Sequence, residues 1–327
     1  MTRPLRIAVT SRAVYPLHGY GGLEQHVYDL VRHLLRVDVD VTLITRPPSA
    51  ARSGLRSAIP SIAEHPRFRV RWVPYRSFPF AGRRGTTVLD RSTAYPVFGF
   101  RAGRVAQALV SAGRIDLVHG LGASVLGYAL SPQSIRRRAP LVFNPQGLEE
   151  FGGTGRTFAG APMKRLFYAP LRQAVRACAR AADRVIATDR AIEPTVLEYL
   201  PVPPERVAVI PNAVDVERCD AMAGPSDGVR VRAHLGDTGS DAILLSVGRL
   251  ELNKGFHILA KALALVRSQA WRWVVVGDGP HREALVRVVA GLGLAGRVHL
   301  AGRVEPAELH AWYEAADLFV HPTLYEG

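Results

Sequence analysis

Short apolar runs alternate with amphipathic helical patterns along almost the whole chain, and this alternation limits the possible folds. The first run, Leu5–Thr10, is followed by a helical pattern over Leu23–Leu35 with its apolar residues on one face. Such alternation is typical of βαβ units, whose parallel strands are covered by helices on both faces. The predicted fold class is therefore α/β, with doubly wound parallel sheets. The expected strands are Leu5–Thr10, Val39–Thr45, Phe68–Val73, Ile115–His119, Leu141–Asn144, Arg184–Thr188, Arg206–Ile210, Ile243–Val247, Trp273–Val276, Val298–Leu300 and Leu318–His321.

A polar stretch over residues 216–241 interrupts this alternation, and the strand–helix pattern then restarts. We interpret the stretch as a linker with a short helix. The length of 327 residues is sufficient for two domains. We predict an N-terminal domain over residues 1–218 and a C-terminal domain over residues 219–327, the second with four strands and three helices.

Cysteine content and hydropathy restrict the class of protein. Cys178 and Cys219 provide neither a disulfide framework nor the spacing of a metal site. No apolar run approaches the roughly 18 residues of a membrane span, and the apolar part of the N-terminus is too short for a signal peptide. We therefore predict a cytoplasmic protein.

The net charge of +14 is unevenly distributed. Residues 1–218 hold 31 Lys and Arg against 16 Asp and Glu, whereas residues 219–327 hold 11 against 12. Such asymmetry indicates an anionic partner, although an arginine-rich composition on a solvated face would also produce it. The long segment from Arg46 to about Tyr95 interleaves many arginines with Trp72, Phe78 and Phe80, which favours peripheral binding to an anionic membrane surface. No nucleic-acid-binding module is present, so nucleic acid is not an expected partner.

The stretch Ser246–Phe256, S-V-G-R-L-E-L-N-K-G-F, has the pattern of an anion-binding corner. An apolar run ends before Gly248, and Arg249 comes directly after this glycine. Lys254 lies five residues beyond Arg249, and a helical pattern begins after Gly255. Free N–H groups at a helix N-terminus and two nearby cations suit a diphosphate. An ordinary surface turn with solvated charges remains the alternative.

An ordered series of motifs resembles the family 4 glycosyltransferases. The matches are G-G-L-E at 21–24, D-L-V-H at 116–119, A-D-R-V-I-A at 182–187, P-P-E-R-V-A-V-I-P-N-A-V-D at 203–215, S-V-G-R-L-E-L-N-K-G at 246–255, V-V-G-D-G-P at 275–280, G-R-V at 302–304, A-A-D-L-F-V at 315–320 and P-T-L-Y-E-G at 322–327. The resemblance covers the chain from end to end. It implies a GT-B fold, in which two Rossmann-like domains face a cleft, and a retaining transferase that uses a nucleotide-diphosphate sugar as donor.

The resemblance also implies roles for residues of the donor site. Gly21, Gly22 and Gly248 would bring the backbone close to the donor. Arg249 and Lys254 would neutralise the diphosphate as it leaves, an electrostatic role for which no metal or other cofactor is expected. The turn at Asp278 and the pair Arg303 and Val304 would lie against the nucleobase, although Asp278 is equally suited to stabilising a turn.

Glu326 matches the first glutamate of the family's E-x7-E motif, which faces the donor sugar. The second glutamate would fall beyond Gly327, so we expect a C-terminally truncated member with an incomplete second domain. The alternative function is then a catalytically incompetent fragment or pseudoenzyme with residual nucleotide or anion binding.

The acceptor side departs from the family pattern. Many members have H-x-H where this chain has His119-Gly120-Leu121, so His119 is the candidate catalytic histidine, and a structural histidine is the alternative. The acceptor-side candidates are Glu24, Gln146 and Glu149. The predicted function is hexosyl transfer to an acceptor hydroxyl on a lipid-linked or cell-envelope glycan.

Overall fold

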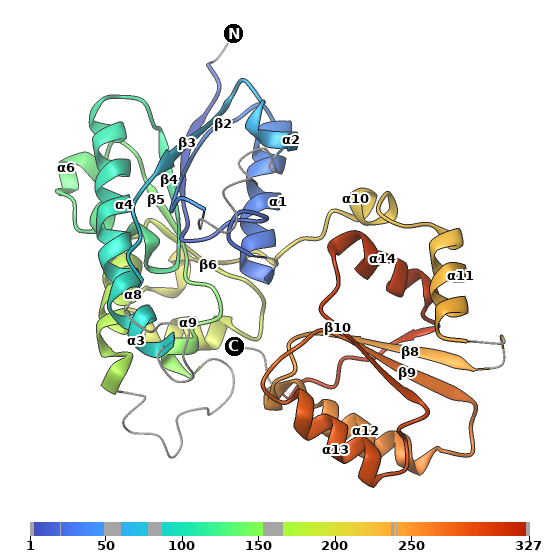
Figure 1. Cartoon of the computed structure of the whole chain (residues 1–327). Coiled ribbons are helices and arrows are strands. Elements are labelled where there is room, and N and C mark those ends of the chain that lie inside the picture. Colours follow the sequence, from blue (N-terminus) through green and yellow to red (C-terminus); the bar gives the residue numbers. More distant parts are fainter. Residues whose placement is uncertain are drawn as a thin grey trace. The chain divides into compact units, whose positions relative to one another are not determined.

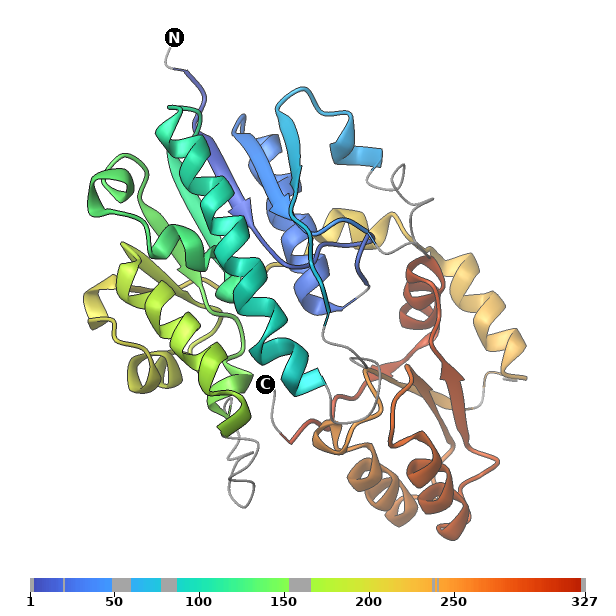
Figure 2. The same cartoon turned by 60° about the vertical axis from the view of Figure 1, so that its left-hand side comes forward.

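The computed structural model describes residues 3–19, 21–48, 60–77, 87–152, 166–236, 239 and 241–324. The chain divides into two compact units between Val214 and Asp215, close to the boundary at 218 that we expected. Each unit has its own parallel sheet and its own core, and each is described separately (Figures 1 and 2).

The first unit is built on a seven-stranded sheet in the order β3-β2-β1-β4-β5-β6-β7, with every described pairing parallel. The order reverses direction at β1, which is the arrangement of a doubly wound fold. The strands are β1 (Arg6–Thr10), β2 (Asp40–Thr45), β3 (Phe68–Trp72), β4 (Leu117–Leu121), β5 (Leu141–Asn144), β6 (Arg184–Ala187) and β7 (Val207–Val209).

Helices cover both faces of this sheet, with α1 and α4 on opposite sides (Figure 1). Ile7 and Val9 of β1 contribute to the core beneath α1, whereas Ala8 contributes to the core beneath α4 and α8. This division follows from the two-residue period of a strand. The helical segments are α1 (Gly22–Arg36), α2 (Pro60–Ala63), α3 (Thr87–Ser92), α4 (Ala94–Ser111), η2 (Gly122–Val125), α5 (Leu126–Ala129), α6 (Gln133–Arg136), η3 (Glu149–Phe151), α8 (Ala169–Ala181), α9 (Glu193–Tyr199) and η4 (Pro204–Arg206).

The second unit repeats the plan with the parallel order β10-β9-β8-β11. Helices α12 and α13 cover one face of this sheet, and α11 and α14 cover the other (Figure 1). Trp273 and Val275 belong to the core on the α12 side, and Val274 and Val276 to the core on the α14 side. Its elements are α10 (Val216–Asp220), α11 (Pro225–His234), β8 (Ala242–Val247), η5 (Leu252–Lys254), α12 (Phe256–Leu265), β9 (Trp271–Val276), α13 (Arg282–Gly291), β10 (Val298–Gly302), α14 (Pro306–Ala315) and β11 (Leu318–Phe319).

The interpretation of residues 216–241 as a linker was wrong for α11. Val231 and Leu235 are buried in the same core as β8 and α14. At Gly228 a Cβ atom would lie 2.8 Å from the carbonyl oxygen of Glu314, so the two helices cross closely. The polar composition of α11 concealed this role because only a narrow apolar stripe is buried.

The strand expected over Phe68–Val73 is present as β3, and one further expectation needs correction. The strand expected to end at His119 instead runs to Leu121, so His119 lies in the middle of β4. Gly120 and Leu121 continue the strand although glycine is uncommon in strands, so the sequence does not mark where the strand ends.

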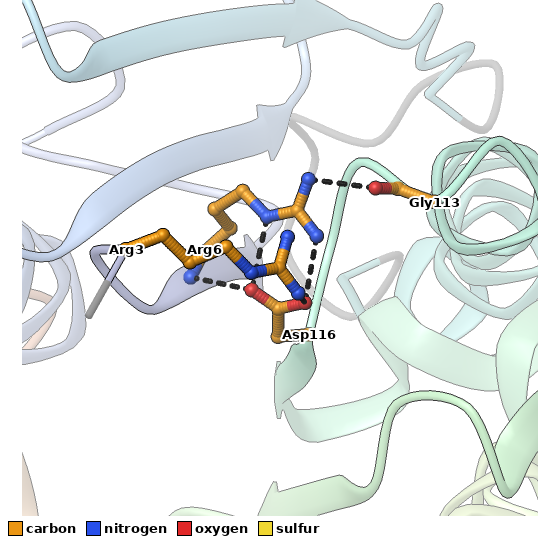
Figure 3. Close-up of polar contacts among 4 residues, drawn as sticks. All are labelled: Arg3, Arg6, Gly113 and Asp116. Carbon is orange, nitrogen blue, oxygen red and sulfur yellow. Dashed lines mark hydrogen bonds and ion pairs between the residues drawn. The ribbon is translucent and has the colours of Figure 1, made fainter. Parts of the chain in front are cut away.

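An ion-pair cluster joins the beginning of β1 to the turn before β4 (Figure 3). The Arg6 side chain donates to Asp116 from Nε at 2.9 Å and from Nη2 at 2.7 Å, and its Nη1 donates to the Gly113 carbonyl at 2.6 Å. Arg3 Nη2 also donates to Asp116, at 2.9 Å. These contacts stabilise the amino edge of the sheet, opposite the carboxyl edge where ligands bind in such folds.

Candidate functional site

The stretch Ser246–Phe256 forms a cationic corner at the carboxyl end of β8. The 3-10 helix η5 and the left-handed Gly255, with a φ of 68°, lead directly into α12. The side chain of Arg249 is 70% exposed, and its Nη1 lies 3.0 Å from Oε1 of Glu251. Lys254 ends η5 and is half-buried. The predicted strand, turn and helix are therefore present, with Arg249 accessible to a ligand.

The loop after β9 lies against this corner through backbone contacts. Leu250 donates its N–H to the Asp278 carbonyl at 3.1 Å. Gly277 has a φ of 136°, and a Cβ there would lie 1.9 Å from the carbonyl oxygen of Gly248. At Gly279 a Cβ would lie 2.5 Å from the Leu250 carbonyl oxygen. Only glycine permits this approach, so the G-D-G sequence is explained by the packing of two loops.

The loop after β11 reaches the same corner. Leu324 donates its N–H to the Asn253 carbonyl at 2.8 Å, and a Cβ at Gly255 would lie 2.0 Å from the carbonyl oxygen of Pro322. Glu326 lies outside the described residues, two positions beyond Leu324. The structure thus brings the segment leading to Glu326 against the segment that carries Lys254.

The residues expected near the nucleobase surround the same edge of the sheet. Asp278 is exposed, and its Oδ1 accepts the N–H of Gly279 at 2.8 Å, which is a turn-stabilising bond. Arg303 follows β10 and is exposed, whereas Val304 packs against the core beneath α11 and α14. The loops after β8, β9 and β10 therefore carry the donor-side candidates that the structure describes.

In the first unit, the predicted glycine loop follows β1 and precedes α1. Gly21 is the residue before the helix, and Gly22 begins it. The Glu24 carboxylate folds back over the loop, since a Cβ at Gly21 would lie 2.5 Å from its Oε2. A Cβ at Gly22 would meet nothing within 4 Å. The Glu24 side chain would have to move to admit a Cβ at Gly21, whereas Gly22 leaves open space at the helix N-terminus.

His119 faces α1 and lies near His26, a residue that the sequence analysis did not single out. The Nε2 atoms of both rings are buried and have no hydrogen-bond partner among the described residues. Burial, together with the charge of His26, lowers the pKa of His119 to about 4. Burial also lowers the pKa of His26. Both rings are therefore neutral at pH 7, and each retains an unused ring nitrogen.

The segment after β5 contains two of the acceptor-side candidates and one residue that we missed. Gln146 adopts a φ of 65°, and its Nε2 is buried without a partner among the described residues. Glu149 lies in η3, and its side chain is outside the described part of the structure. Glu150 is buried, which raises the pKa of its carboxyl group to about 7. The adjacent glutamate pair alone did not reveal which of the two points inward.

A cavity of about 200 Å³ lies beside the cationic corner, between the segment leading into α12 and α13. Neither Arg249 nor Lys254 lines it. Its lining is mostly apolar and consists of Leu250, Glu251, Leu252, Phe256, His257, His281, Ala284, Leu285 and Val288. The cavity therefore shares Leu250, Glu251, Leu252 and Phe256 with the cationic corner, although the two cations do not line it.

The arginine-rich segment is described only in part. Arg69 and Arg71 are exposed on the edge strand β3, next to Trp72, whose exposure is 42%. The arginines at 52, 56, 83 and 84 and both Phe78 and Phe80 lie outside the described residues. Within the described ranges, no helix is long and apolar enough to cross a membrane, and no three His, Cys, Asp or Glu side chains gather as metal ligands would.

The model described as Glycosyltransferase Family 4 matches residues 20–218, and the model described as Glycosyl transferases group 1 matches residues 241–327. A D-inositol 3-phosphate glycosyltransferase of Kineococcus radiotolerans is 29% identical over 325 residues, covering 94% of this chain and 68% of the relative. The enzyme of the same name from Xylanimonas cellulosilytica is 27% identical over 343 residues, covering 100% of this chain and 76% of the relative.

Among solved structures, Anabaena Alr3699/HepE in complex with UDP and glucose aligns with a TM-score of 0.64. It is 22% identical, and the alignment covers 98% of this chain and 74% of the Anabaena chain. At that identity the likeness concerns the fold. The two sheets described above are accordingly those of the GT-B glycosyltransferases.

Proposed function

The chain belongs to glycosyltransferase family 4, and we propose that it transfers a hexosyl group from a nucleotide-diphosphate sugar to an acceptor hydroxyl. The observation that carries this proposal is the convergence of four loops at the carboxyl edge of β10-β9-β8-β11. Arg249, Lys254, Asp278 and Arg303 all lie on these loops. The complex of the Anabaena protein with UDP and glucose supports a nucleotide-sugar donor.

Arg249 and Lys254 are proposed to bind the donor diphosphate and to stabilise the charge that develops when it leaves. The exposed guanidinium of Arg249 is held by a single ion pair with Glu251, which a diphosphate can replace. The N-terminus of α12 adds free N–H groups and a partial positive charge at the same corner. These fixed positive groups favour the transition state because charge on the leaving oxygen grows as the glycosidic bond breaks.

Within the first unit, the open backbone at Gly22 is proposed to approach the donor, and His119 to contact the reacting sugar. A neutral imidazole at pH 7 with an unused ring nitrogen suits hydrogen bonding to a sugar hydroxyl. The carboxylate of Glu326 is proposed to face the donor sugar. The proposed acceptor-side groups are Gln146 and the glutamates Glu149 and Glu150.

We propose a retaining mechanism in which the acceptor attacks the face that the diphosphate leaves. The departing phosphate oxygen would accept the acceptor's proton, so no metal or cofactor is required. Time-resolved proton NMR of the first product would show the same anomeric configuration as the donor. Unchanged turnover in excess EDTA is expected, whereas loss of turnover that Mg²⁺ restores would contradict metal independence.

The acceptor is proposed to be a small phosphorylated polyol. The names of the relatives from Kineococcus and Xylanimonas, D-inositol 3-phosphate glycosyltransferases, support this class. A lipid-linked or cell-envelope glycan is the competing acceptor, motivated by the basic composition of residues 46–95 and an anionic membrane surface. Co-sedimentation with vesicles containing phosphatidylglycerol, but not with pure phosphatidylcholine vesicles, would favour that competing class.

Donor binding tests the proposal directly. Thermal shift and calorimetry against UDP-, GDP- and ADP-glucose should identify one preferred base. Arg249→Ala together with Lys254→Ala should weaken that binding about 100-fold, since each charged hydrogen bond contributes about 1.5–3 kcal/mol. Arg230→Ala is a matched control, because Arg230 is 67% exposed and pairs with Asp227 in the same unit.

Equal donor affinity in the double variant and the control would overturn the diphosphate assignment. Tight donor binding without transfer to any polyol or glycan acceptor would instead favour the non-catalytic alternative, a protein that binds nucleotide only.

A further inference from the structure

Two arginines occupy adjacent positions at the carboxyl edge of the first unit's sheet. Arg12 follows β1 and Arg46 follows β2, and these strands are parallel neighbours. The backbone of this edge is tied together, since Ser11 donates its N–H to the Ile44 carbonyl at 3.1 Å. Ligands bind at this edge in doubly wound sheets. Neither arginine was singled out as a site residue by the sequence analysis.

An aromatic ring stacks against each of the two guanidinium groups. The Arg12 guanidinium lies 4.9 Å from the centre of the Tyr95 ring, and that of Arg46 lies 5.3 Å from the centre of the Tyr75 ring. Stacking uses the face of a guanidinium and leaves the N–H donors of its edge available. The Nε atoms of both arginines are buried and have no hydrogen-bond partner among the described residues.

The rings are themselves fixed by hydrogen bonds. Tyr95 donates its hydroxyl to the Leu121 carbonyl at 3.0 Å, above Gly122, where a Cβ would lie 2.5 Å from that hydroxyl oxygen. Tyr75 donates its hydroxyl to Oδ2 of Asp90 at 2.5 Å. Because the supporting rings are positioned in advance, the two guanidinium groups are preorganised for a ligand.

The charges around the arginines are only partly balanced. Asp90 Oδ2 forms an ion pair with Arg12 Nη1 at 3.9 Å, which is too long for a hydrogen bond. Burial and the neighbouring charge of Arg12 lower the pKa of Arg46, while Tyr75, Glu24 and Asp90 oppose this shift. Arginine nevertheless stays protonated in proteins, so two like charges remain close together.

His18 adds no charge beside Arg12 and Arg46, but it holds the backbone of Arg46 in place. Its Nδ1 accepts the Val14 N–H at 3.0 Å, so Nε2 carries the proton and donates to the Arg46 carbonyl at 2.9 Å. Burial and the charge of Arg46 lower the pKa of His18 to about 4, which keeps the ring neutral at pH 7. The backbone of Arg46 is thereby fixed to the loop after β1.

We propose that Arg12 and Arg46 together bind the phosphoryl group of the acceptor. A phosphate ester offers several oxygens and up to two negative charges, which two guanidinium forks can share, whereas one carboxylate would occupy a single fork. This assignment rests on the proposed function, in which the acceptor is a phosphorylated polyol. The same phosphoryl chemistry is found in the donor diphosphate and in free phosphate, so the test separates these sources.

The experiment measures binding, which does not depend on turnover. Inorganic phosphate, D-inositol 3-phosphate, inositol and UDP are titrated into the protein and into its Arg12→Gln and Arg46→Gln variants by calorimetry. Each variant should bind D-inositol 3-phosphate and inorganic phosphate about 10- to 100-fold more weakly, the usual effect of losing a charged hydrogen bond. UDP affinity should remain within about twofold.

Controls keep the result interpretable. Arg104→Gln removes an exposed arginine of α4 whose Nη1 donates to Gln107, and it should leave every affinity unchanged. Arg12→Lys and Arg46→Lys retain the charge and should recover part of the phosphate affinity, and circular dichroism establishes that the variants are folded. An equal loss of UDP affinity would transfer the site to the donor diphosphate, and unchanged affinity for D-inositol 3-phosphate would overturn the proposal. Donor affinity in the parent protein separately tests the proposed function.

Discussion

The guanidinium of Arg6 and the carboxylate of Asp116 form two parallel hydrogen bonds, at 2.9 Å and 2.7 Å. The backbone N–H of Arg6 donates to the same carboxylate at 3.1 Å, so β1 and the turn before β4 are joined by both side chain and main chain. The hydrogen bonds from Arg6 lower the pKa of Asp116 to about 2.

Asp116 should therefore make the stability of the first unit acid-sensitive. Its pKa is lower in the folded state than in the unfolded chain, so its contribution is complete above pH 4 and is lost as the pH falls through about 2. The shift corresponds to about 2 kcal/mol. Urea unfolding of Asp116→Asn at pH 7 should show a loss of that size. Arg3→Ala, which removes a partner that is 68% exposed, should change little.

Burial of a neutral His119 should make the stability of the first unit depend on pH between about 6.5 and 4. The folded pKa is about 4 and the unfolded value about 6.5, so the unfolded chain binds more protons between these limits. Stability should be greatest above pH 6.5 and fall towards pH 4, by at most about 3 kcal/mol. In His119→Gln the slope between pH 6.5 and 4 should be shallower; an unaltered slope would mean that His119 is protonated in the folded state.

Gly277→Ala should disrupt the donor corner. The added methyl group would lie 1.9 Å from the Gly248 carbonyl oxygen, at a φ of 136° that costs other residues about 1–3 kcal/mol. We expect a lower melting temperature and weaker UDP binding. Gly296→Ala places its methyl group in open space and should leave both unchanged. Normal UDP affinity in Gly277→Ala would contradict the close packing of the loops after β8 and β9.

Ser246→Ala should destabilise the second unit without changing any proposed ligand contact. The buried Ser246 hydroxyl accepts from Trp273 Nε1 at 3.0 Å and donates to the Val320 carbonyl at 2.6 Å. Removing it leaves the buried Trp273 N–H and the part-buried Val320 carbonyl without this partner, which costs about 1–3 kcal/mol for the buried group. Differential scanning calorimetry should show the loss. Ser268→Ala, at an exposed position, is the control and should melt with the parent protein.

The sequence predicted the two sheets well because fully buried parallel strands leave continuous apolar runs. Val41, Leu43 and Ile44 or Val274, Val275 and Val276 have few alternatives to the interior. The sequence was less informative for a helix that buries only one narrow face. In α11 only Val231 and Leu235 face the core, and a polar composition therefore concealed an integral helix.

The parts of the candidate site that lie within short runs of consecutive residues could be predicted from the sequence. Arg249, Lys254 and the glycines of the G-D-G turn lie within short motifs, and the structure brings their loops together. Arg12 and Arg46 are separated by the whole of α1, and only the pairing of β1 with β2 makes them neighbours. The family match tests the kind of enzyme, whereas the roles of individual residues await the variants described above.

The bond from Leu324 to Asn253, with Pro322 seated against Gly255, makes the loops after β8 and β11 interdependent in length. An insertion in either loop would displace the other, so both loops together set the spacing between Lys254 and Leu324. Changes in sugar preference should consequently arise here by residue substitution at fixed loop length. Grafting experiments that seek a new donor should exchange both loops together.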